Sequence, residues 1–499
     1  MAAGSDMGLY VLIGVIIYSI ILIVLGYVYR QKKLTLKDYF LGGKTTGALF
    51  LFFTLYATQY SGNTFVSYAG KAYRLGFWWV VSIPFFLMIY LTYLWFAPRL
   101  YVISKKREYI TPADFIKDRF NSPLAALIAS LLMLYGLSNY LLEQVGSMGH
   151  SFEGITQGLV PYWAGALFLV AVMVVYEWLG GWKGVVWTDF IQGAIMVTGL
   201  ISILLVIAFK YPLGPAVHAW LENEKTSKLI MPPPKSFIKT WLTIYVLVGI
   251  GAAIYPQAIQ RIYAAKNEET LKRSISGLAI MPFITPLAIL LMGIEARYYF
   301  PGLSKIESDK AFPLFMSMLA NEGIIYFLVT LIMFMAVLAA IQSTADSVLL
   351  SIGSMLSKDI YREWVNKSAD ERRATLVGKI TAVILIFLIF LVGMAPRTTL
   401  WHLTEIKFEV LIQAAPAFIL GLYWKRMARV PTIIGMIAGA SLAVGMKLTI
   451  GKYMGIYEGL WGLLLNLLIV IIGSLMIRDE ESIRKAEELF SLIPKSNRK

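Results

Sequence analysis

The chain has 499 residues, of which 58% are hydrophobic and 15% are charged. A soluble globule of this length does not need so many apolar runs that can cross a bilayer, about 20 residues each, so the composition excludes a soluble domain and indicates an all-α polytopic membrane protein. The formal net charge of +15 would favour nucleic-acid binding in a soluble protein. Here Lys and Arg gather in particular loops, as membrane topology requires, and we expect no nucleic-acid partner. Cysteine is absent, which excludes disulfides and thiolate metal ligands.

Apolar runs, taken in chain order, predict thirteen membrane-spanning helices in one membrane domain over residues 1–499. The first run lacks the basic start and the small-residue cleavage site of a signal peptide, so we expect it to be retained as a helix. The predicted spans are 8–28, 46–72, 77–103, 123–153, 159–179, 185–208, 237–262, 272–299, 323–356, 374–395, 403–424, 431–450 and 457–477.

The loops between these spans carry unequal numbers of basic residues. Placing the N-terminus outside puts 31 of the 45 Lys and Arg residues on the cytoplasmic side, Arg261 among them, and thirteen on the outer side. Lys407 is within or near the span 403–424. The positive-inside rule therefore predicts a multi-pass protein of the plasma (inner) membrane with an outer N-terminus and a cytoplasmic C-terminus.

Two spans are interrupted by residues that disfavour a continuous helix. The middle of the span 46–72 reads TQYSGNT, which is polar and contains a glycine, and the span 237–262 contains Gly249, Gly251 and Pro256. Either span could be an ordinary kinked helix, because Gly and Pro are common in membrane helices.

The positions of the two interruptions favour a transporter. If the core consists of two five-helix repeats, 46–208 and 237–424, the interrupted spans are the first of each repeat. Paired broken helices at corresponding places are the best sequence indication of a transporter's binding site at the bilayer midplane. An unwound backbone leaves carbonyls without helical partners, and a dehydrated cation can satisfy them.

The apolar span 323–356 contains a polar stretch, AAIQSTADSVLL. A carboxylate at this depth, here Asp346, costs at least about 2.5–3.5 kcal/mol on insertion scales and marks a functional-site hypothesis. The hydroxyl-bearing residues share one arc of the helix with it, and Ser343 and Ser347 are one turn apart. Two hydroxyls and the free carbonyls of a broken helix would form an all-oxygen, near-neutral cage that suits a hard monovalent cation. The alternative is that these hydroxyls bond their own helix or a neighbouring one.

Several motifs occur in an order and at spacings that are familiar together. They are DYFLGGK (38–44), SGNTFVSYAGKAYRLG (61–76), ITPADFIKDRF (110–120), GGWKGVVWTDFIQG (180–193), PQAIQRIYAAK (256–266), AAIQSTADSVLL (339–350) and QAAPAFILGLYWKR (413–426). Through them nearly the whole chain resembles the sodium/solute symporter family, which includes bacterial proline, pantothenate, monocarboxylate and sugar carriers and the animal sodium–glucose cotransporters.

The resemblance implies an inverted-repeat fold of the leucine transporter (LeuT) type, in which helices 1 and 6 are discontinuous and further helices are added at both ends. It also implies alternating access in a single transport domain, with sodium as the coupling ion between the spans 46–72 and 323–356. Carried over by position, the sodium ligands are the carbonyls of Ala57, Tyr60 and Ala340 and the hydroxyls of Ser343 and Thr344.

Some members of the family have a further sodium position nearer the cytoplasm. Asp189, Ser343, Asp346 and Ser347 fall on the residues that form it. Asp346 stands where a well-understood member has Ser, so this place would either bind a second sodium ion or hold a proton. Asp189 could instead make a structural hydrogen bond beside the cytoplasmic mouth.

The solute pocket should face the broken helices. We see no arginine deep in a span, so any anionic group would be held by helix termini and amides. Ile83, Val248 and Gly251 stand where sugar carriers place polar residues, and a sugar would leave unpaired hydroxyls there. The motifs look more like those of the carboxylate and pantothenate carriers, followed by the proline carriers. Candidate solute-binding residues are Gln59, Asn63, Thr64, Asn139, Glu143, Tyr255 and Gln413, whereas for Tyr245 packing is favoured over contact, and Glu143 could equally pair within the bundle.

The resulting hypothesis is sodium-coupled secondary active uptake of a small organic solute, a monocarboxylate, a pantothenate-like compound or an amino acid such as proline. Proton coupling through Asp346 or Asp189 is an alternative within the same fold. A membrane solute sensor is less favoured because the tail after residue 478 is short. The three histidines lie in separate segments without a nucleophile–base spacing, so we expect no enzyme. We expect membrane lipid and the solute as partners and no obligate protein partner.

Overall fold

The computed structural model describes residues 2–30, 35–156, 158–394 and 399–494. Within these residues the regular structure is helical, and the β contact that occurs is an isolated bridge between Thr46 and Ala265. In this described part of the chain, ten helical stretches are long and apolar enough to cross a membrane. The predicted all-α membrane architecture is therefore confirmed.

Eleven helices make up most of the bundle. They are α1 (Ala2–Val28), α5 (Ser82–Arg107), α7 (Pro123–Ile155), α8 (Tyr162–Phe209), α11 (Lys235–Ala253), α14 (Thr285–Tyr299), α16 (Ile324–Met355), α17 (Glu371–Gly393), α18 (Leu400–Leu411), α20 (Arg429–Thr449) and α21 (Glu458–Met476).

Some of the ten apolar stretches are longer than one crossing. Gly62–Arg107, Tyr162–Phe209 and Ile324–Val365 have 46, 48 and 42 residues, whereas one crossing needs about 20. The number ten therefore counts continuous helical stretches and not membrane crossings. The thirteen crossings and the two repeats, 46–208 and 237–424, remain predictions.

Gly181 divides the longest of these stretches. It has φ 51° and ψ −150° inside α8, so the spans predicted at 159–179 and 185–208 are two helical halves that meet at this residue. A Cβ atom here would lie 2.8 Å from Cε2 of Tyr39. The positive φ and the close approach together require glycine.

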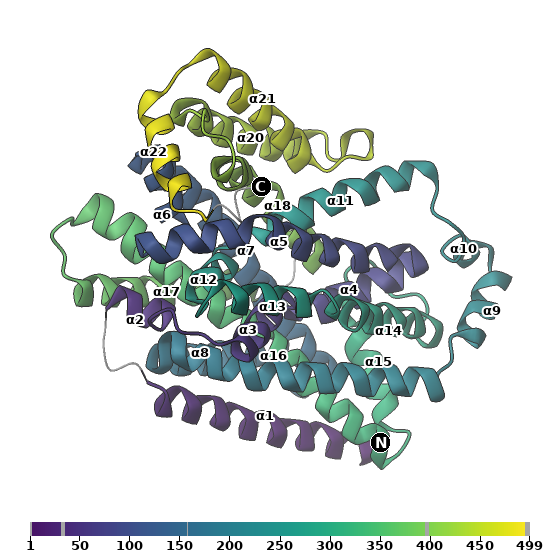
Figure 1. Cartoon of the computed structure of the whole chain (residues 1–499). Helices are drawn as coiled ribbons and strands as arrows, with labels where there is room; N and C mark the ends of the chain where they lie inside the picture. Colours follow the sequence, from purple (N-terminus) through teal and green to yellow (C-terminus); the bar gives the residue numbers. More distant parts are fainter. Residues whose placement is uncertain (1, 31–34, 157, 395–398, 495–499) are drawn as a thin grey trace.

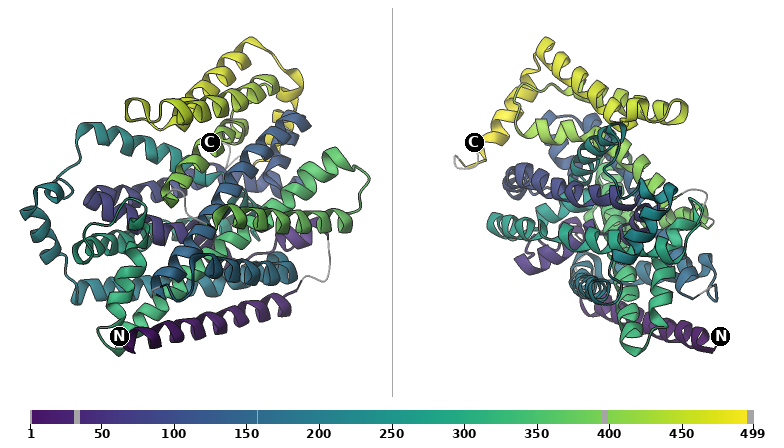
Figure 2. Two further views of the ribbon diagram at one scale, coloured as in Figure 1. Left: turned by 180° about the vertical axis from the view of Figure 1, so that it is seen from behind. Right: turned by 90° about the vertical axis from the view of Figure 1, so that its right-hand side faces the viewer.

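The bundle has two outer edges and a buried centre (Figures 1 and 2). α1 packs along α8 at one edge, and the hairpin of α20 and α21 lies at the opposite edge. At the centre, α16 is buried at every residue from Ala336 to Met355. Outer helices carry exposed apolar side chains, such as Ile20 on α1 and Leu391 on α17, at 55% and 60% exposure. This distribution suits helices that face lipid.

Several short helices were not among the predicted spans. The span predicted at 272–299 is split into α13 and α14, and the span predicted at 403–424 divides after α18 into short helical turns. The pieces of these divided spans include α13 (Glu268–Leu278) and α19 (Ala415–Ile419). The short helices outside the predicted spans are α2 (Leu36–Leu41), α6 (Pro112–Phe120), α9 (Gly214–Glu222), α10 (Glu224–Ser227), α15 (Ala311–Ala320) and α22 (Glu480–Ser491). Their apolar runs are too short to register as crossings.

Candidate sodium site and solute pocket

The first predicted interruption is a break between two helices. α3 (Ala48–Gln59) ends before Tyr60, and α4 (Gly62–Leu75) begins after Ser61, with both linking residues extended. A Cβ atom on Gly62 would lie 2.0 Å from Cγ1 of Ile341 on α16. Glycine therefore lets the break approach α16 closely. The last carbonyls of α3 lack N–H partners in their own helix.

The second predicted interruption is also confirmed. α11 ends at Ala253, and α12 (Pro256–Ala264) begins after a two-residue link. Pro256 occupies the first turn of α12, where its missing N–H costs no helical hydrogen bond. The two broken helices meet in the buried centre of the protein, beside α16.

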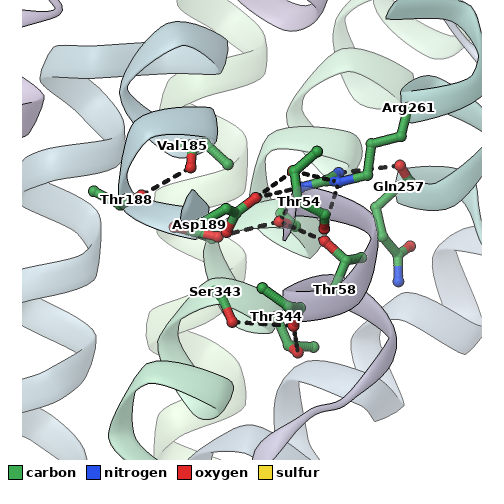
Figure 3. Close-up of polar contacts among 12 residues, drawn as sticks. Thr54, Thr58, Val185, Thr188, Asp189, Gln257, Arg261, Ser343 and Thr344 are labelled. Carbon is green, nitrogen blue, oxygen red and sulfur yellow. Dashed lines mark hydrogen bonds and ion pairs between the residues drawn. The ribbon is translucent and has the colours of Figure 1, made fainter. Parts of the chain in front are cut away.

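Oxygen atoms from α3 and α16 converge at the first break. The Ser343 and Thr344 hydroxyls lie 3.0 and 3.2 Å from the Ala57 carbonyl oxygen, and the Ser343 hydroxyl is also 3.3 Å from the Ala340 carbonyl oxygen (Figure 3). All four residues are fully buried. Because a hydroxyl can rotate to offer a lone pair instead of its proton, this cluster can supply several neutral oxygens to a cation.

Tyr60, the fifth predicted sodium ligand, belongs to the link between α3 and α4. Its N–H donates to the Tyr56 carbonyl at 3.0 Å, and its ring stacks on Phe86 with centroids 4.5 Å apart. The structure thus places Tyr60 at the break with its ring packed away. Ligation by its carbonyl remains a prediction.

The residues predicted for a second cation form a network with an arginine in it. The Arg261 guanidinium lies 3.0 Å from Oδ2 of Asp189 and donates to the Ser347 hydroxyl (Figure 3). Its Nε donates to the Thr54 hydroxyl at 2.8 Å. The Tyr176 hydroxyl donates to Asp346 at 2.8 Å. All of these side chains are buried in the described structure.

Arg261 corrects two of our predictions. It was assigned to a cytoplasmic loop, and the spans were expected to contain no deep arginine, yet its side chain is 1% exposed. The break before Pro256 turns α12 inward, which brings Arg261 to Asp189 on α8. The guanidinium also lies 5.3 Å from the Trp182 ring centroid, so its charge is compensated by a carboxylate, hydrogen bonds and an aromatic face.

A separate cavity lies beside the first break, with a volume of about 20 Å³. This is far below the about 300–1,000 Å³ typical of sites for drug-sized ligands, so the lining side chains nearly close the cavity in this arrangement. Its lining residues are Gln59, Ser61, Asn63, Thr64, Tyr68, Phe86, Ile89, Tyr140, Val248, Ala252, Tyr255, Thr404, Lys407 and Phe408.

Four predicted solute residues line this cavity, and three do not. Glu143 is fully buried behind it and pairs with Lys407. Asn139 donates to the Tyr135 carbonyl of its own helix at 2.9 Å. Gln413 donates to the Gly459 carbonyl at 2.9 Å, at the packing between the end of α18 and α21. The four that line it are Gln59, Asn63, Thr64 and Tyr255.

Lys407 is the main cavity residue that the sequence analysis missed as a binding group. It lies on the face of α18 that also carries Thr404 and Phe408, at the spacing of one helical turn. An ionisable residue within a predicted span is itself a signal of function. The same argument that singled out Asp346 therefore applies to Lys407.

Comparisons with known proteins show the family to which the chain belongs. The sequence model of the sodium:solute symporter family matches residues 39–439. The osmoregulated proline transporter OpuE of Bacillus subtilis (strain 168) is 27% identical over 95% of this chain and 96% of its own length. The sodium/proline symporter of Staphylococcus aureus is 26% identical over 93% of this chain and 92% of its own.

A solved structure supports the fold. The outward-open state of a Na⁺-coupled sialic acid symporter superimposes with a TM-score of 0.77 and 20% sequence identity, covering 94% of this chain and 98% of that one. This likeness confirms the predicted LeuT-type fold. Since the family's sequence model covers most of the chain, the protein belongs to the sodium:solute symporter family.

Proposed function

We propose that the protein imports a small organic solute by sodium-coupled symport with alternating access. Its family makes it a transporter and not an enzyme. The observation that supports sodium coupling is the convergence of the Ser343 and Thr344 hydroxyls on the Ala57 carbonyl oxygen at 3.0 and 3.2 Å. Sodium at this place would join α3 to α16 and stabilise the arrangement that completes the solute cavity.

The energetics permit concentrative uptake. One charge moving across 100 mV is worth about 2.3 kcal/mol, and a tenfold sodium gradient adds about 1.4 kcal/mol. Together they allow accumulation of several hundredfold per sodium ion. The proposed orientation, in the plasma (inner) membrane with an outer N-terminus, lets sodium enter down its gradient.

The proposed solute is a small amino acid such as proline. Two relatives, OpuE of Bacillus subtilis and the symporter of Staphylococcus aureus, are named as proline carriers, and the cavity is small and lined by aromatic and amide side chains. A monocarboxylate or a pantothenate-like compound is the alternative from the motifs.

Arg261 lies at the second predicted cation position, and we therefore propose that one sodium ion is transported in each cycle. Its guanidinium lies between Asp189 and Ser347, where it supplies a fixed positive charge. Asp346 is left with neutral partners, Tyr176 and Ser347. Proton coupling through Asp346 stays the rival within this fold.

Purified protein in proteoliposomes tests the proposal. We expect Ser343→Ala with Thr344→Ala to abolish sodium-stimulated uptake of L-proline and the sodium-induced rise in melting temperature. Thr330→Ala is the matched control, because Thr330 is also buried on α16 but its hydroxyl donates to the Met316 carbonyl. Sodium responses of wild-type size in the double variant would refute the site. Uptake driven by a pH jump without sodium would instead favour proton coupling.

A further inference from the structure

One side of the solute cavity carries a buried cation. Lys407 Nζ lies 3.0 Å from Oε2 of Glu143, and the two side chains are 2% and 0% exposed. The ammonium also lies 3.6 Å from the Tyr140 ring centroid and 4.8 Å from that of Phe408. A carboxylate partner and aromatic faces are the groups that make a buried ammonium tolerable.

The hydrogen-bonding capacity of Lys407 is not used up. An ammonium has three N–H donors, and among the described residues Nζ donates one hydrogen bond, to Glu143. The remaining donors belong to a side chain that lines the cavity. They are suited to a carboxylate, since hydrogen bonds between two charged groups are the strong ones.

Another part of the cavity wall carries two hydrogen-bond acceptors to which no group donates. Oε1 of Gln59 and Oδ1 of Asn63 are buried and have no hydrogen-bond partner in the described part of the chain. The amide nitrogens of the same side chains are engaged: Gln59 donates to Tyr93, and Asn63 donates to the Thr404 hydroxyl at 2.6 Å. These bonds orient both amides so that their oxygens stay available. A buried acceptor left unpaired is unfavourable, so these oxygens indicate a ligand that donates N–H groups.

The acceptors and the cation line the same small cavity. Thr404, which accepts a hydrogen bond from the Asn63 amide at 2.6 Å, precedes Lys407 by three residues on α18, so both lie on one face of that helix. A molecule with a carboxylate and an amine on neighbouring atoms carries the two groups that such a wall can bind, each through a hydrogen bond of about 2.9 Å.

We propose that Lys407 binds the carboxylate of a zwitterionic amino acid, while the amide oxygens of Gln59 and Asn63 accept hydrogen bonds from its ammonium group. This inference rests on the proposed transport function and names the solute class. Lys407 and Glu143 have opposite charges, so the cavity wall is neutral and matches a solute without net charge. Aromatic side chains such as Tyr255 and Phe86 contact the apolar body of the solute.

Binding of four probe compounds to the purified full-length protein tests the proposal. L-Proline has both charged groups, L-prolinamide lacks the carboxylate, cyclopentanecarboxylate lacks the amine, and pyrrolidine has the amine alone. In saturating sodium, we expect each of the three analogues to bind about 10- to 150-fold more weakly than L-proline, as for the loss of one charge-assisted hydrogen bond. Calorimetric titration gives the four dissociation constants.

A paired substitution assigns the effect to Lys407. Lys407→Met with Glu143→Gln removes both charges at nearly constant volume, which avoids an unpaired buried carboxylate. In this variant we expect L-proline and L-prolinamide to bind within about threefold of each other. Lys447→Met with Glu409→Gln is the matched control, because this ion pair, with its atoms 3.1 Å apart, lies outside the cavity, and the control should keep the wild-type preference.

The contrary outcomes are distinct. Equal binding of L-proline and L-prolinamide to the wild type, or an unchanged preference in the paired variant, would overturn the role of Lys407. Binding of cyclopentanecarboxylate as tight as that of L-proline would overturn the zwitterion in favour of a monocarboxylate, and binding of no probe would overturn the solute class. The rise in melting temperature that sodium alone causes is measured in parallel. If the wild-type protein shows no such rise, the proposal of sodium-coupled transport fails, and not only the assignment of Lys407.

Discussion

Replacing Gly62 by alanine should weaken sodium binding without removing any sodium ligand. The new Cβ would lie 2.0 Å from Cγ1 of Ile341 and 3.1 Å from its Cδ1 and from Cβ of Ser147. Ile341 is fully buried on α16, two residues before Ser343. The break between α3 and α4 must therefore move away from α16, which separates the Ala57 carbonyl from the Ser343 and Thr344 hydroxyls.

The size of the effect follows from the cost of overpacking a core, about 1–3 kcal/mol. If that cost falls on the sodium-bound arrangement, the sodium affinity decreases about 5- to 150-fold. Titration of the melting temperature of purified Gly62→Ala protein with sodium chloride at constant ionic strength measures it. Gly47→Ala is the control, since Gly47 is the N-cap residue directly before α3, and its added Cβ meets no atom within 4 Å.

A second substitution tests whether the contact with Ile341 causes the loss of sodium affinity. Ile341→Ala removes the side-chain atoms that the new methyl group would meet, so the double variant Gly62→Ala/Ile341→Ala should regain part of the lost sodium affinity. Folded Gly62→Ala protein with wild-type sodium affinity would show that the close approach does not position Ala57. Absence of any recovery in the double variant would show that the damage arises elsewhere.

Further substitutions test the neighbouring assignments. Arg261→Gln should leave Asp189 without its cationic partner and lower the stability of the protein by about 3–5 kcal/mol. Sodium should restore more of this lost stability than potassium does. Equal restoration by both ions would contradict the idea that Arg261 takes the place of a cation. Asn139→Ala should leave solute affinity unchanged in the same calorimetric titration, because the Asn139 amide bonds its own helix; a tenfold change would return it to the binding site. Gln413→Leu should lower the melting temperature with little change in solute affinity, since Gln413 and Asn466 join the end of α18 to α21; a selective loss of binding at an unchanged melting temperature would argue against this packing role.

The sequence identified the features that are local. The breaks near Gly62 and Pro256 were indicated by residue type, because a polar glycine-containing stretch and a proline disfavour a continuous helix, and their matching positions in the two expected repeats favoured breaks over kinks. The cluster on α16 was visible as a run of hydroxyls around a carboxylate. The family motifs then brought Ala57 and Ser343 together, and the structure places their oxygen atoms 3.0 Å apart.

The features that the sequence did not reveal depend on contacts between distant segments. Arg261 lies at the end of the span 237–262 and counts as a residue of the following loop until Asp189, 72 positions earlier, is seen beside it. Gln413 was predicted to bind the solute, but its side chain donates a hydrogen bond to Gly459 on α21. Lys407 required Glu143 on α7, 264 positions away, to account for its charge. No periodicity in one segment encodes such pairs.

The short turn that ends α3 has a thermodynamic consequence for how the two cargoes influence each other. Ala57, whose carbonyl faces Ser343, and Gln59, whose amide faces the solute cavity, are two residues apart in the same turn. An ion that orders this turn for the organic cargo thereby raises the affinity for that cargo. Because the coupling free energy between two sites acts in both directions, the organic cargo must raise the affinity for the ion by the same factor. A single turn of helix is then enough to couple the two binding sites.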